Sequence, residues 1–405
     1  MNKTRRFPAA LGLGIAALLV VASALGAGYL AARDGNDDTA TLAGSDEPTA
    51  TAEALTPTPG EEDAEGQATS NGQQLIYSLF GQSADSLMSF DPDSGETAEL
   101  LSVPHAENYG ITGSVSANGV IAYLSLPTNL GGPQANLLAS SSAELWTLNG
   151  GSPEQLAGGF DLRGVPEWSP DGEQLAVQSI EYSTETSEAP AKIELVDLEG
   201  SIETLVDRDA VLALEVIGYS RDGDRLYFAE TLPGGTTVIQ EANLASGSVS
   251  EITRGDDYIE FVSWTVGEDE IAAMVVDTSA EGEPERRVVT VGIGESNRGV
   301  RGAVAAESEE TLSPAWLDGE LSFGRAPEGA IAGILILRAG GLSQLTDAAG
   351  VLEIPEFWSG DGSLLAGLRF SSFPPTMPGR PFVLLPNGER IDVPISGEVT
   401  LLGWR

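Results

Sequence analysis

Residues 168–177 decide the fold, and they read Trp-Ser-Pro-Asp-Gly-Glu-Gln-Leu-Ala-Val. Ser, any residue, Asp and then Gly is the preference of a type I turn, and Pro is favoured at its second position. Gly172 can adopt the left-handed backbone conformation that closes a short hairpin. The apolar run after the turn is typical of a strand. The stretch therefore predicts a strand that ends at Trp168, a tight turn and a second strand, with the indole packed between neighbouring sheets.

The same pattern recurs along the chain. Residues 219–228 read Tyr-Ser-Arg-Asp-Gly-Asp-Arg-Leu-Tyr-Phe, and residues 358–365 read Trp-Ser-Gly-Asp-Gly-Ser-Leu-Leu. With weaker copies they give seven anchor positions, which lie 42 to 53 residues apart: Val115, Trp168, Tyr219, Trp264, Trp316, Trp358 and Trp404. Each interval holds about four strand-like runs without helical periodicity, and such a repeat is typical of a β-propeller. The sequence therefore predicts an all-β fold, a β-propeller over residues 73–405.

The anchors predict seven four-stranded blades, one of which is shared by the two ends of the chain. Its first strand would be residues 398–405, and its other three strands would be residues 74–80, 86–90 and 97–103. Closing the ring in this way leaves no inner edge with unpaired backbone groups. A six-bladed ring with residues 73–103 outside it is the alternative, but it leaves three strand patterns unpaired.

The run Trp-Ser-Pro-Asp-Gly-x-x-Leu-Ala resembles the WD40-like (PD40) repeats of TolB-type propellers, which also occur in peptidases of the prolyl oligopeptidase family. The resemblance covers residues 73–405. It implies the propeller fold but no single function, because these repeats serve scaffolds, receptors and enzyme lids alike. TolB carries a globular domain before a six-bladed propeller, and the peptidases carry an α/β-hydrolase domain. Neither domain is expected in this sequence.

Residues 1–32 predict an export signal. Lys3, Arg5 and Arg6 precede an uncharged apolar run over residues 7–32, which as a helix would be about 39 Å long, more than the ~30 Å hydrocarbon core of a bilayer. The positive charges predict a cytoplasmic N-terminus, so the rest of a single-pass chain would lie outside the cell membrane. A cleaved signal peptide, cut after Ala24, is the alternative and would give a secreted protein.

Residues 33–72 predict a disordered linker. The segment holds ten acids against one base and is rich in Thr, Pro and Gly. It cannot bury enough apolar surface to offset its ordering entropy. The predicted organisation is thus a signal anchor (1–32), a tether (33–72) and the propeller (73–405).

Composition excludes several functions. With 20 Lys and Arg against 61 Asp and Glu, the net charge is −41, which disfavours a nucleic-acid partner and leaves residues 7–32 as the only expected membrane contact. No cysteine and a single histidine leave no thiolate or His-rich metal site. The run Asp91 to Glu96 is similar to the start of a calcium loop but fits a turn better. No catalytic residue, cofactor or metal is predicted.

Propellers bind ligands where the loops between blades, and those joining the second and third strands, converge on the central channel. By that family rule the predicted ligand-contacting residues are His105, Tyr109, Phe160, Arg163, Arg208, Tyr258 and Arg380. His105 itself is expected to be a solvated loop residue.

These observations predict a non-enzymatic module that binds an unknown protein or ligand of the cell envelope. One alternative is a carboxylate-dependent hydrolase or lyase that acts on sugars in the channel, for which two carboxylates about 5–9 Å apart would be needed. A channel plugged by apolar side chains would exclude it. The other alternative is an extracytoplasmic sensor.

Overall fold

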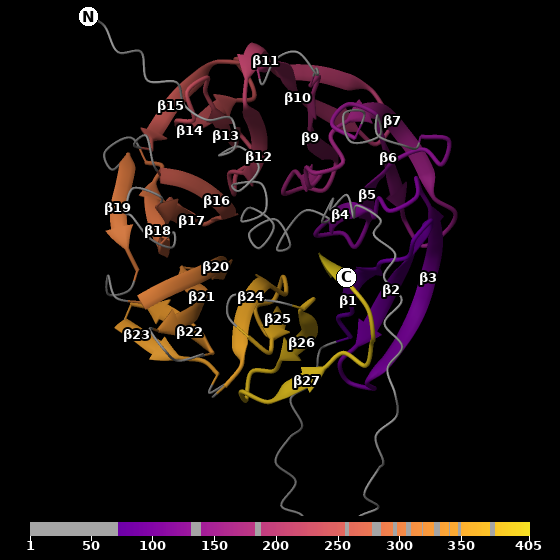
Figure 1. Cartoon of the computed structure of the whole chain (residues 1–405), viewed down its shortest axis with the longest axis vertical. Helices are drawn as coiled ribbons and strands as arrows, with labels where there is room; N and C mark the ends of the chain where they lie inside the picture. Colours follow the sequence, from indigo (N-terminus) through magenta and orange to yellow (C-terminus); the bar gives the residue numbers. More distant parts are fainter. Residues whose placement is uncertain are drawn as a thin grey trace, which may run out of the picture.

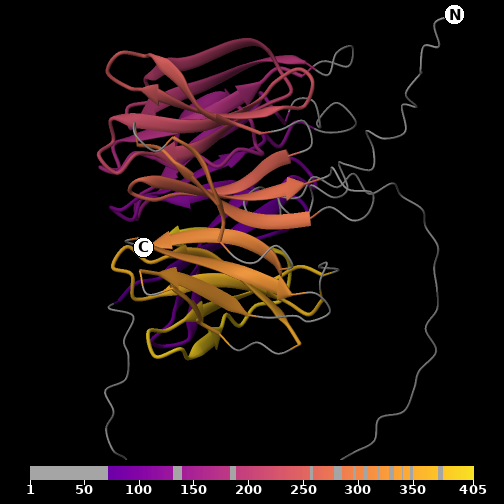
Figure 2. The ribbon, with the colours of Figure 1, turned by 90° about the vertical axis from the view of Figure 1, so that its left-hand side faces the viewer.

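The computed structural model of the chain describes residues 72–130, 139–182, 188–255, 259–277, 285–294, 298–304, 309–317, 319–327, 333–339, 341–346, 350–372 and 377–405. Within these ranges the chain forms seven four-stranded sheets that are arranged as the blades of a ring (Figure 1). In side view the C-terminus lies on one face of the ring (Figure 2). The predicted all-β propeller is confirmed.

Each blade runs from an innermost strand beside the ring centre to an outermost strand at the rim. In that order, blade 1 consists of β28 (Val399–Trp404), β1 (Leu75–Leu79), β2 (Ala84–Asp91) and β3 (Glu96–Pro104). Blade 2 consists of β4 (Thr112–Val115), β5 (Ile121–Ser125), β6 (Ala143–Leu148) and β7 (Glu154–Phe160). Blade 3 consists of β8 (Glu167–Trp168), β9 (Gln174–Ile180), β10 (Ala189–Asp197) and β11 (Ile202–Val211). Blade 4 consists of β12 (Ala213–Tyr219), β13 (Arg225–Thr231), β14 (Thr237–Asn243) and β15 (Val249–Arg254).

The remaining blades follow the same order. Blade 5 consists of β16 (Ile259–Val266), β17 (Glu270–Asp277), β18 (Glu285–Gly292) and β19 (Gly299–Ala303). Blade 6 consists of β20 (Glu309–Leu317), β21 (Glu320–Pro327), β22 (Ile334–Arg338) and β23 (Gly341–Gln344). Blade 7 consists of β24 (Leu352–Trp358), β25 (Leu365–Phe370), β26 (Arg380–Leu384) and β27 (Arg390–Asp392).

Blade 1 joins the two ends of the propeller. β28 pairs antiparallel with β1, from Leu75 opposite Trp404 to Leu79 opposite Val399. The backbones of Gln74 and Arg405 exchange hydrogen bonds of 2.8 and 2.9 Å. The predicted seven-bladed closure is therefore confirmed, and the six-bladed alternative is wrong because β1, β2 and β3 are strands of the ring.

The repeated turns adopt the predicted hairpin. Ser169 donates to Oδ1 of Asp171 (2.6 Å), and Gly172 has a positive φ of 72° and donates its N–H to the Ser169 carbonyl. Equivalent bonds hold the turns at residues 220–222 and 359–361. In each case the Ser and Asp side chains of the turn hydrogen-bond to each other, so the turn is stabilised by its own residues. This explains why the same short pattern precedes the second strand of several blades.

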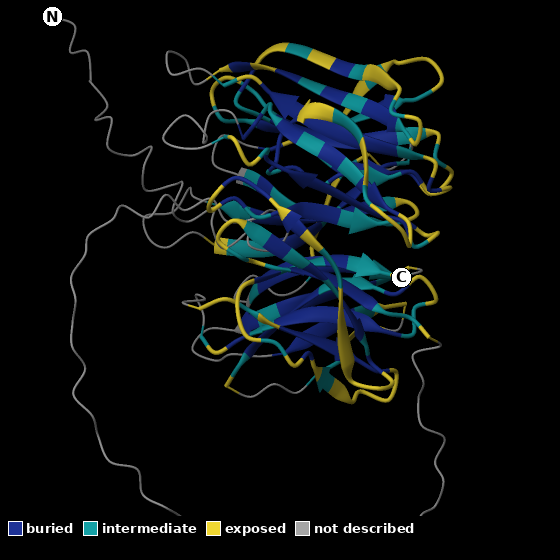
Figure 3. Cartoon of the chain, turned by 90° about the vertical axis from the view of Figure 1, so that its right-hand side faces the viewer, coloured by how far each residue is buried: buried dark blue, intermediate teal, exposed yellow. Residues whose placement is uncertain are grey.

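The core lies between neighbouring blades. One buried cluster combines Ile193 of blade 3 with Phe228 of blade 4, and Tyr219 packs in it. Trp168 packs against the equivalent cluster between blades 2 and 3. Exposed residues gather at the turns and outer strands, while the strand interiors are buried (Figure 3). The anchor aromatics therefore pack between sheets, as predicted.

The predicted export segment, residues 7–32, and the linker up to residue 71 lie outside the described residues. In the part of the chain that the structure describes, no helix is long and apolar enough to cross a membrane.

Candidate functional site

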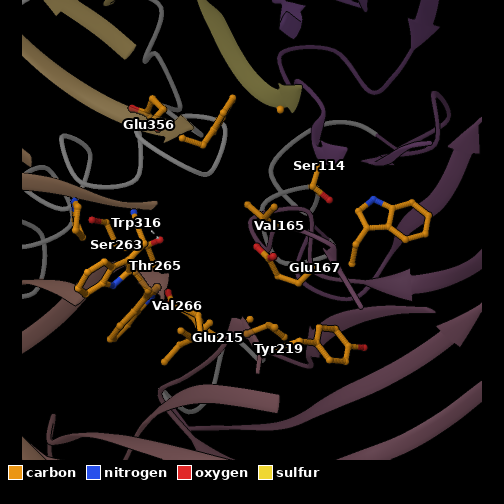
Figure 4. A pocket seen from close by; sticks show the side chains of 18 of the residues that line it. Ser114, Val165, Glu167, Glu215, Tyr219, Ser263, Thr265, Val266, Trp316 and Glu356 are labelled. Carbon is orange, nitrogen blue, oxygen red and sulfur yellow. Dashed lines mark hydrogen bonds between the residues drawn. The ribbon is translucent and has the colours of Figure 1, made fainter. Parts of the chain in front are cut away.

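The innermost strands of all seven blades surround a central channel with a volume of about 1210 Å³ (Figure 4). Side chains of β4, β8, β12, β16, β20, β24 and β28 line it. Ser114, Val165 and Thr265 are among the smaller residues of the lining. The channel is thus an open cavity at the centre of the propeller.

Irregular pairing of the inner strands shapes the lining. On β16 the register shifts between Val262 and Trp264, which leaves Ser263 unpaired with a φ of 42°. On β24 the shift between Pro355 and Phe357 leaves Glu356 unpaired. A bulge turns a side chain away from the regular alternation of a strand. The direction of these side chains is therefore set by the bulges.

Four glutamates of the inner strands put carboxyl groups into the channel: Glu167 on β8, Glu215 on β12, Glu260 on β16 and Glu356 on β24. The surrounding protein raises the pKa of all four, and raises the pKa of Glu167 to about 8. The side chain of Glu215 is nevertheless exposed in the channel, and those of the other three are half-buried. For Glu167, Glu260 and Glu356 burial is the sole cause of the raised pKa. A protein environment solvates a charge less well than water does, so the neutral acid is favoured. The neutral form of Glu167 is therefore favoured more strongly than it would be in water.

Glu215 differs from the other three because it belongs to a polar network. Burial and then the charge of Asp161 raise its pKa, while a hydrogen bond from Trp264 and the charge of Arg163 lower it. Asp161 is 1% exposed and holds the Arg163 guanidinium by two hydrogen bonds of 2.8 Å. The guanidinium carbon also lies 5.0 Å from the ring centre of Tyr182. The network therefore fixes Arg163 in the connection from β7 to β8, beside the channel.

The basic residues of the lining lie outside the strands. They are Arg163, Arg221 in the turn after β12, and Arg405 after β28. Asp161 pairs with Arg163, and Glu268 lies 3.7 Å from Arg221. Among the described residues, the strand-borne lining contains four carboxyl groups and no base.

Arg163 is the predicted ligand-contacting residue that the structure brings to the channel. Arg208 instead lies at the outer part of blade 3 and pairs with Glu230 at 3.0 Å. Arg380 is exposed at the start of β26, and Tyr258 lies outside the described residues. The binding roles of these residues stay predictions.

The prediction that His105 is a solvated loop residue is wrong. Its side chain is buried and contacts the Ala106 carbonyl and the Asp85 carboxylate. Phe160 is fully buried in the core between blades 2 and 3, and Tyr109 is only 8% exposed. None of the three lines the channel, because Tyr109 and Phe160, the last residue of β7, pack in the core and His105 pairs with Asp85.

The four channel glutamates were missed by the loop rule, because they lie on strands. One signal was available in the sequence: Glu215 and Glu260 each stand four residues before the anchor aromatic of their blade. Equivalent positions in neighbouring repeats face the same side of a propeller. The pattern would have placed two carboxyl groups on the channel wall.

The calcium-like run at residues 91–96 is a turn. Asp91 accepts hydrogen bonds from the Asp93 N–H (2.9 Å) and the Ser94 hydroxyl (3.0 Å), and its carbonyl accepts the Gly95 N–H. Within the described ranges, no three or more His, Cys, Asp and Glu side chains are placed to hold a metal ion together.

Known proteins resemble this chain in structure only. No family model matches the sequence, and no curated protein matches it. TolB from Acinetobacter baumannii is 16% identical over 82% of this chain and 66% of TolB, with a TM-score of 0.48. A prolyl endopeptidase is 15% identical over 82% of this chain and 49% of its own, with a TM-score of 0.52. Oligogalacturonate lyase from Vibrio parahaemolyticus is 13% identical over 70% and 84%, with a TM-score of 0.44.

The chain spans about half the length of the endopeptidase and just under two thirds of TolB. At these identities the likeness shows the fold alone. A fold alone settles neither binding nor catalysis. The chain is a seven-bladed β-propeller.

Proposed function

We propose that the protein is a membrane-tethered, extracytoplasmic binding module that takes its ligand into the central channel without catalysing a reaction. The observation that carries the proposal is the open channel of about 1210 Å³, which all seven blades line. Ligand sites favour concave cavities of this size with a few placed polar groups. The membrane tether and the outside location are supported by the sequence of residues 1–34.

The absence of catalysis is supported by the chemistry of the lining. The sole histidine, His105, is engaged with Asp85 in the core, so no histidine can activate a channel serine. Acid–base catalysis by two carboxyl groups needs one neutral and one ionised partner, which requires environments that push their pKa values apart. The pKa of all four channel glutamates is shifted in the same direction, upward, so none is marked as the ionised partner by a lowered pKa.

A carboxylate-dependent hydrolase or lyase is the second candidate, because the channel is open and burial raises the pKa of Glu167 to about 8. A general acid of glycoside hydrolysis has a raised pKa of this kind. None of the other three channel glutamates has a lowered pKa that would mark it as the ionised partner. Binding is therefore the better-supported function.

The channel proposal predicts that a plug prevents binding. In Val165→Trp a large ring replaces a small side chain of the channel wall, whereas Val300→Trp makes the same change on the outer strand β19, where Val300 is 49% exposed. Full-length protein from solubilised membranes should carry its ligand in the wild type and in Val300→Trp. Native mass spectrometry should show at least a tenfold loss of bound mass in Val165→Trp, at an unchanged melting temperature. Equal bound mass in both variants would refute the channel as the site.

The proposed membrane tether predicts on which side of the membrane the propeller lies. Residues 1–34 place positive charge before the apolar run and acids after it. Protease added to intact spheroplasts should therefore digest the propeller, as the positive-inside rule requires. Immunoblotting of the propeller gives the readout, and a cytoplasmic protein in the same sample is the control. Full protection of the propeller until the membrane is lysed would contradict the outside location.

A further inference from the structure

We propose that the channel ligand carries organic cations, primary ammonium or guanidinium groups, which dock on the carboxyl groups of Glu167, Glu260 and Glu356. The inference rests on the proposed function, because it names the chemistry of the ligand that the channel takes. It starts from the fact that these three carboxyl groups have no hydrogen bond or ion pair in the described part of the chain. In Glu356 the Oε1 atom is buried and has no partner.

A half-buried carboxyl group on the wall of an open channel, with no partner in the protein, has only the water of the channel to solvate it, and a group of opposite charge can replace that water. Two buried acids outside the channel, Glu230 and Glu353, differ from the channel glutamates, because Glu230 pairs with Arg208 and Glu353 pairs with Arg390. Glu167 points into the channel in Figure 4. The missing partner of the channel carboxyl groups is therefore expected to arrive from outside the chain.

The strands of the channel do not supply the opposite charge. Their lining contains no base within the described ranges, and the guanidinium groups of Arg163 and Arg221 lie beside Asp161 and Glu268. The third base of the lining, Arg405, follows β28, and its side chain lies against Gly119 and Gly150 in the turns of blade 2. A ligand that fits this lining brings positive charge. An anionic ligand would meet four carboxyl groups with no free cation on the described strands.

The spacing of the carboxyl groups favours an extended organic cation over a metal ion. Glu167, Glu260 and Glu356 come from blades 3, 5 and 7, and Figure 4 shows Glu167 and Glu356 on different sides of the channel. No group of three or more acids or histidines among the described residues converges on one point. A ligand with several separated charges satisfies such a lining, whereas one ion does not.

Aromatic rings in the lining of the channel fit the same class of ligand. Trp168, Trp316 and Phe357 line the channel. The face of an aromatic ring attracts ammonium and guanidinium groups. The indole Nε1 atoms of Trp168 and Trp316 are buried without an acceptor, so polar atoms of the lining still lack partners.

Docking exchanges a proton for the ligand. The carboxyl group gives up its proton to water, and the carboxylate accepts a hydrogen bond from the bound ammonium group, so one proton leaves for each carboxyl group that was neutral. The raised pKa of Glu167, about 8, keeps that proton in place before docking. Affinity should therefore rise as the pH rises from 6 toward 8, and protons should appear in the buffer.

The test is titration calorimetry of the full-length protein with spermine and with tetralysine, which separate a free polyamine from a lysine-bearing peptide segment. The channel variant carries Glu167→Gln, Glu260→Gln and Glu356→Gln. The matched control carries Glu96→Gln, Glu99→Gln and Glu203→Gln on the exposed outer strands β3 and β11, with the same loss of charge. Charge-assisted hydrogen bonds predict at least about a 30-fold loss of affinity in the channel variant and at most about a twofold change in the control.

Binding of spermine, of tetralysine or of both supports the inference and identifies the source of the cation. Paired titrations in buffers of different ionisation heat should show proton release in the wild type and not in the channel variant. The channel variant should melt at or above the wild-type temperature at pH 8, because it removes enclosed carboxyl groups, so lost binding is not lost folding.

Three outcomes overturn the inference. The first is that neither probe binds. The second is that the control variant loses as much affinity as the channel variant, which would mean that the probes are attracted by the net charge of the protein. The third is that acetylated tetralysine binds as well as tetralysine does. In the last case, if Val165→Trp still blocks the acetylated peptide, the channel function stands and only the cation class fails. If Val165→Trp blocks no probe, both proposals fail.

Discussion

Removal of residues 398–405 should abolish the cooperative unfolding of the propeller. The truncation deletes β28, the innermost strand of blade 1, and leaves the backbone groups of β1 without a partner at the channel edge. It also removes the buried side chains of Val399 and Leu402 and the indole of Trp404, whose Nε1 donates to the Phe357 carbonyl. An open strand edge with exposed apolar surface is prone to aggregation. Scanning calorimetry should show a broad or absent transition.

A graded version of this experiment separates lost packing from lost pairing. Leu402→Ala keeps β28 but removes most of a side chain that is 4% exposed, which should cost about 2–5 kcal/mol of unfolding free energy. Leu342→Ala, on β23 where the side chain is 44% exposed, should change it by less than about 0.5 kcal/mol. A truncated protein that melts as sharply and as late as the full chain would show that the ring does not depend on this closure.

Local turn chemistry explains why so much of the fold was predictable. Ser169, Asp171 and Gly172 make their bonds with one another, so the hairpin follows from a few neighbouring residues. Repetition of this signal then gives the number of blades, and the strands left at the two ends give the closure. Each step uses contacts between residues that are close in sequence or equivalent in the repeat.

The candidate site depends on features that short sequence patterns do not carry. Glu356 faces the channel because of a bulge in the pairing of β24 with β25, and a bulge depends on the neighbouring strand as well as on the bulged residue. The loop rule found Arg163 because its connection lies beside the channel. It failed for Phe160, which is in a similar position in the chain but turns into the core. Which side a loop residue faces is decided by packing.

His105 shows the same limit at a single residue. The pattern around it is that of a polar loop, but its partner Asp85 is twenty residues away on β2. No feature of the sequence around His105 indicates that it pairs with Asp85. The consequence of the pair for stability is large, and it can be measured directly because the chain has one histidine.

Hydrogen bonds define His105 as a cation. Its Nδ1 lies 2.8 Å from the Ala106 carbonyl, which can only accept, so Nδ1 donates. Its Nε2 lies 2.9 Å from Asp85 Oδ1, and Asp85 already accepts from the Ser78 hydroxyl and from the N–H groups of Gly81 and Ile111. With three donors already directed at its two oxygens, the Asp85 carboxyl group acts as an acceptor, so Nε2 donates as well. Burial lowers the pKa of His105, but the hydrogen bonds to Asp85 and Ala106 and the Asp85 charge outweigh burial and raise it.

Asp85→Ala should therefore destabilise the protein by about 3–5 kcal/mol, because it leaves a buried imidazolium unpaired and three donors unsatisfied. The matched control is Glu251→Ala, which breaks the exposed pair with Arg254 and should cost less than about 1 kcal/mol. Denaturant unfolding near pH 6 gives both values. A loss for Asp85→Ala as small as the control would mean that the pair contributes nothing.

The sign of the pH dependence follows from the raised pKa. The folded state holds the His105 proton more tightly than the unfolded chain, whose pKa is near 6.5, so this stabilisation is complete below that pH and is lost as the pH rises through the folded pKa. The channel glutamates act in the same direction, so the wild type is compared with His105→Gln, which keeps them. The difference in unfolding free energy between the two should shrink as the pH rises, and the imidazole shifts of the single histidine should titrate above 6.5. A titration below 6.5, or a difference that does not change with pH, would show that Asp85 faces a neutral ring.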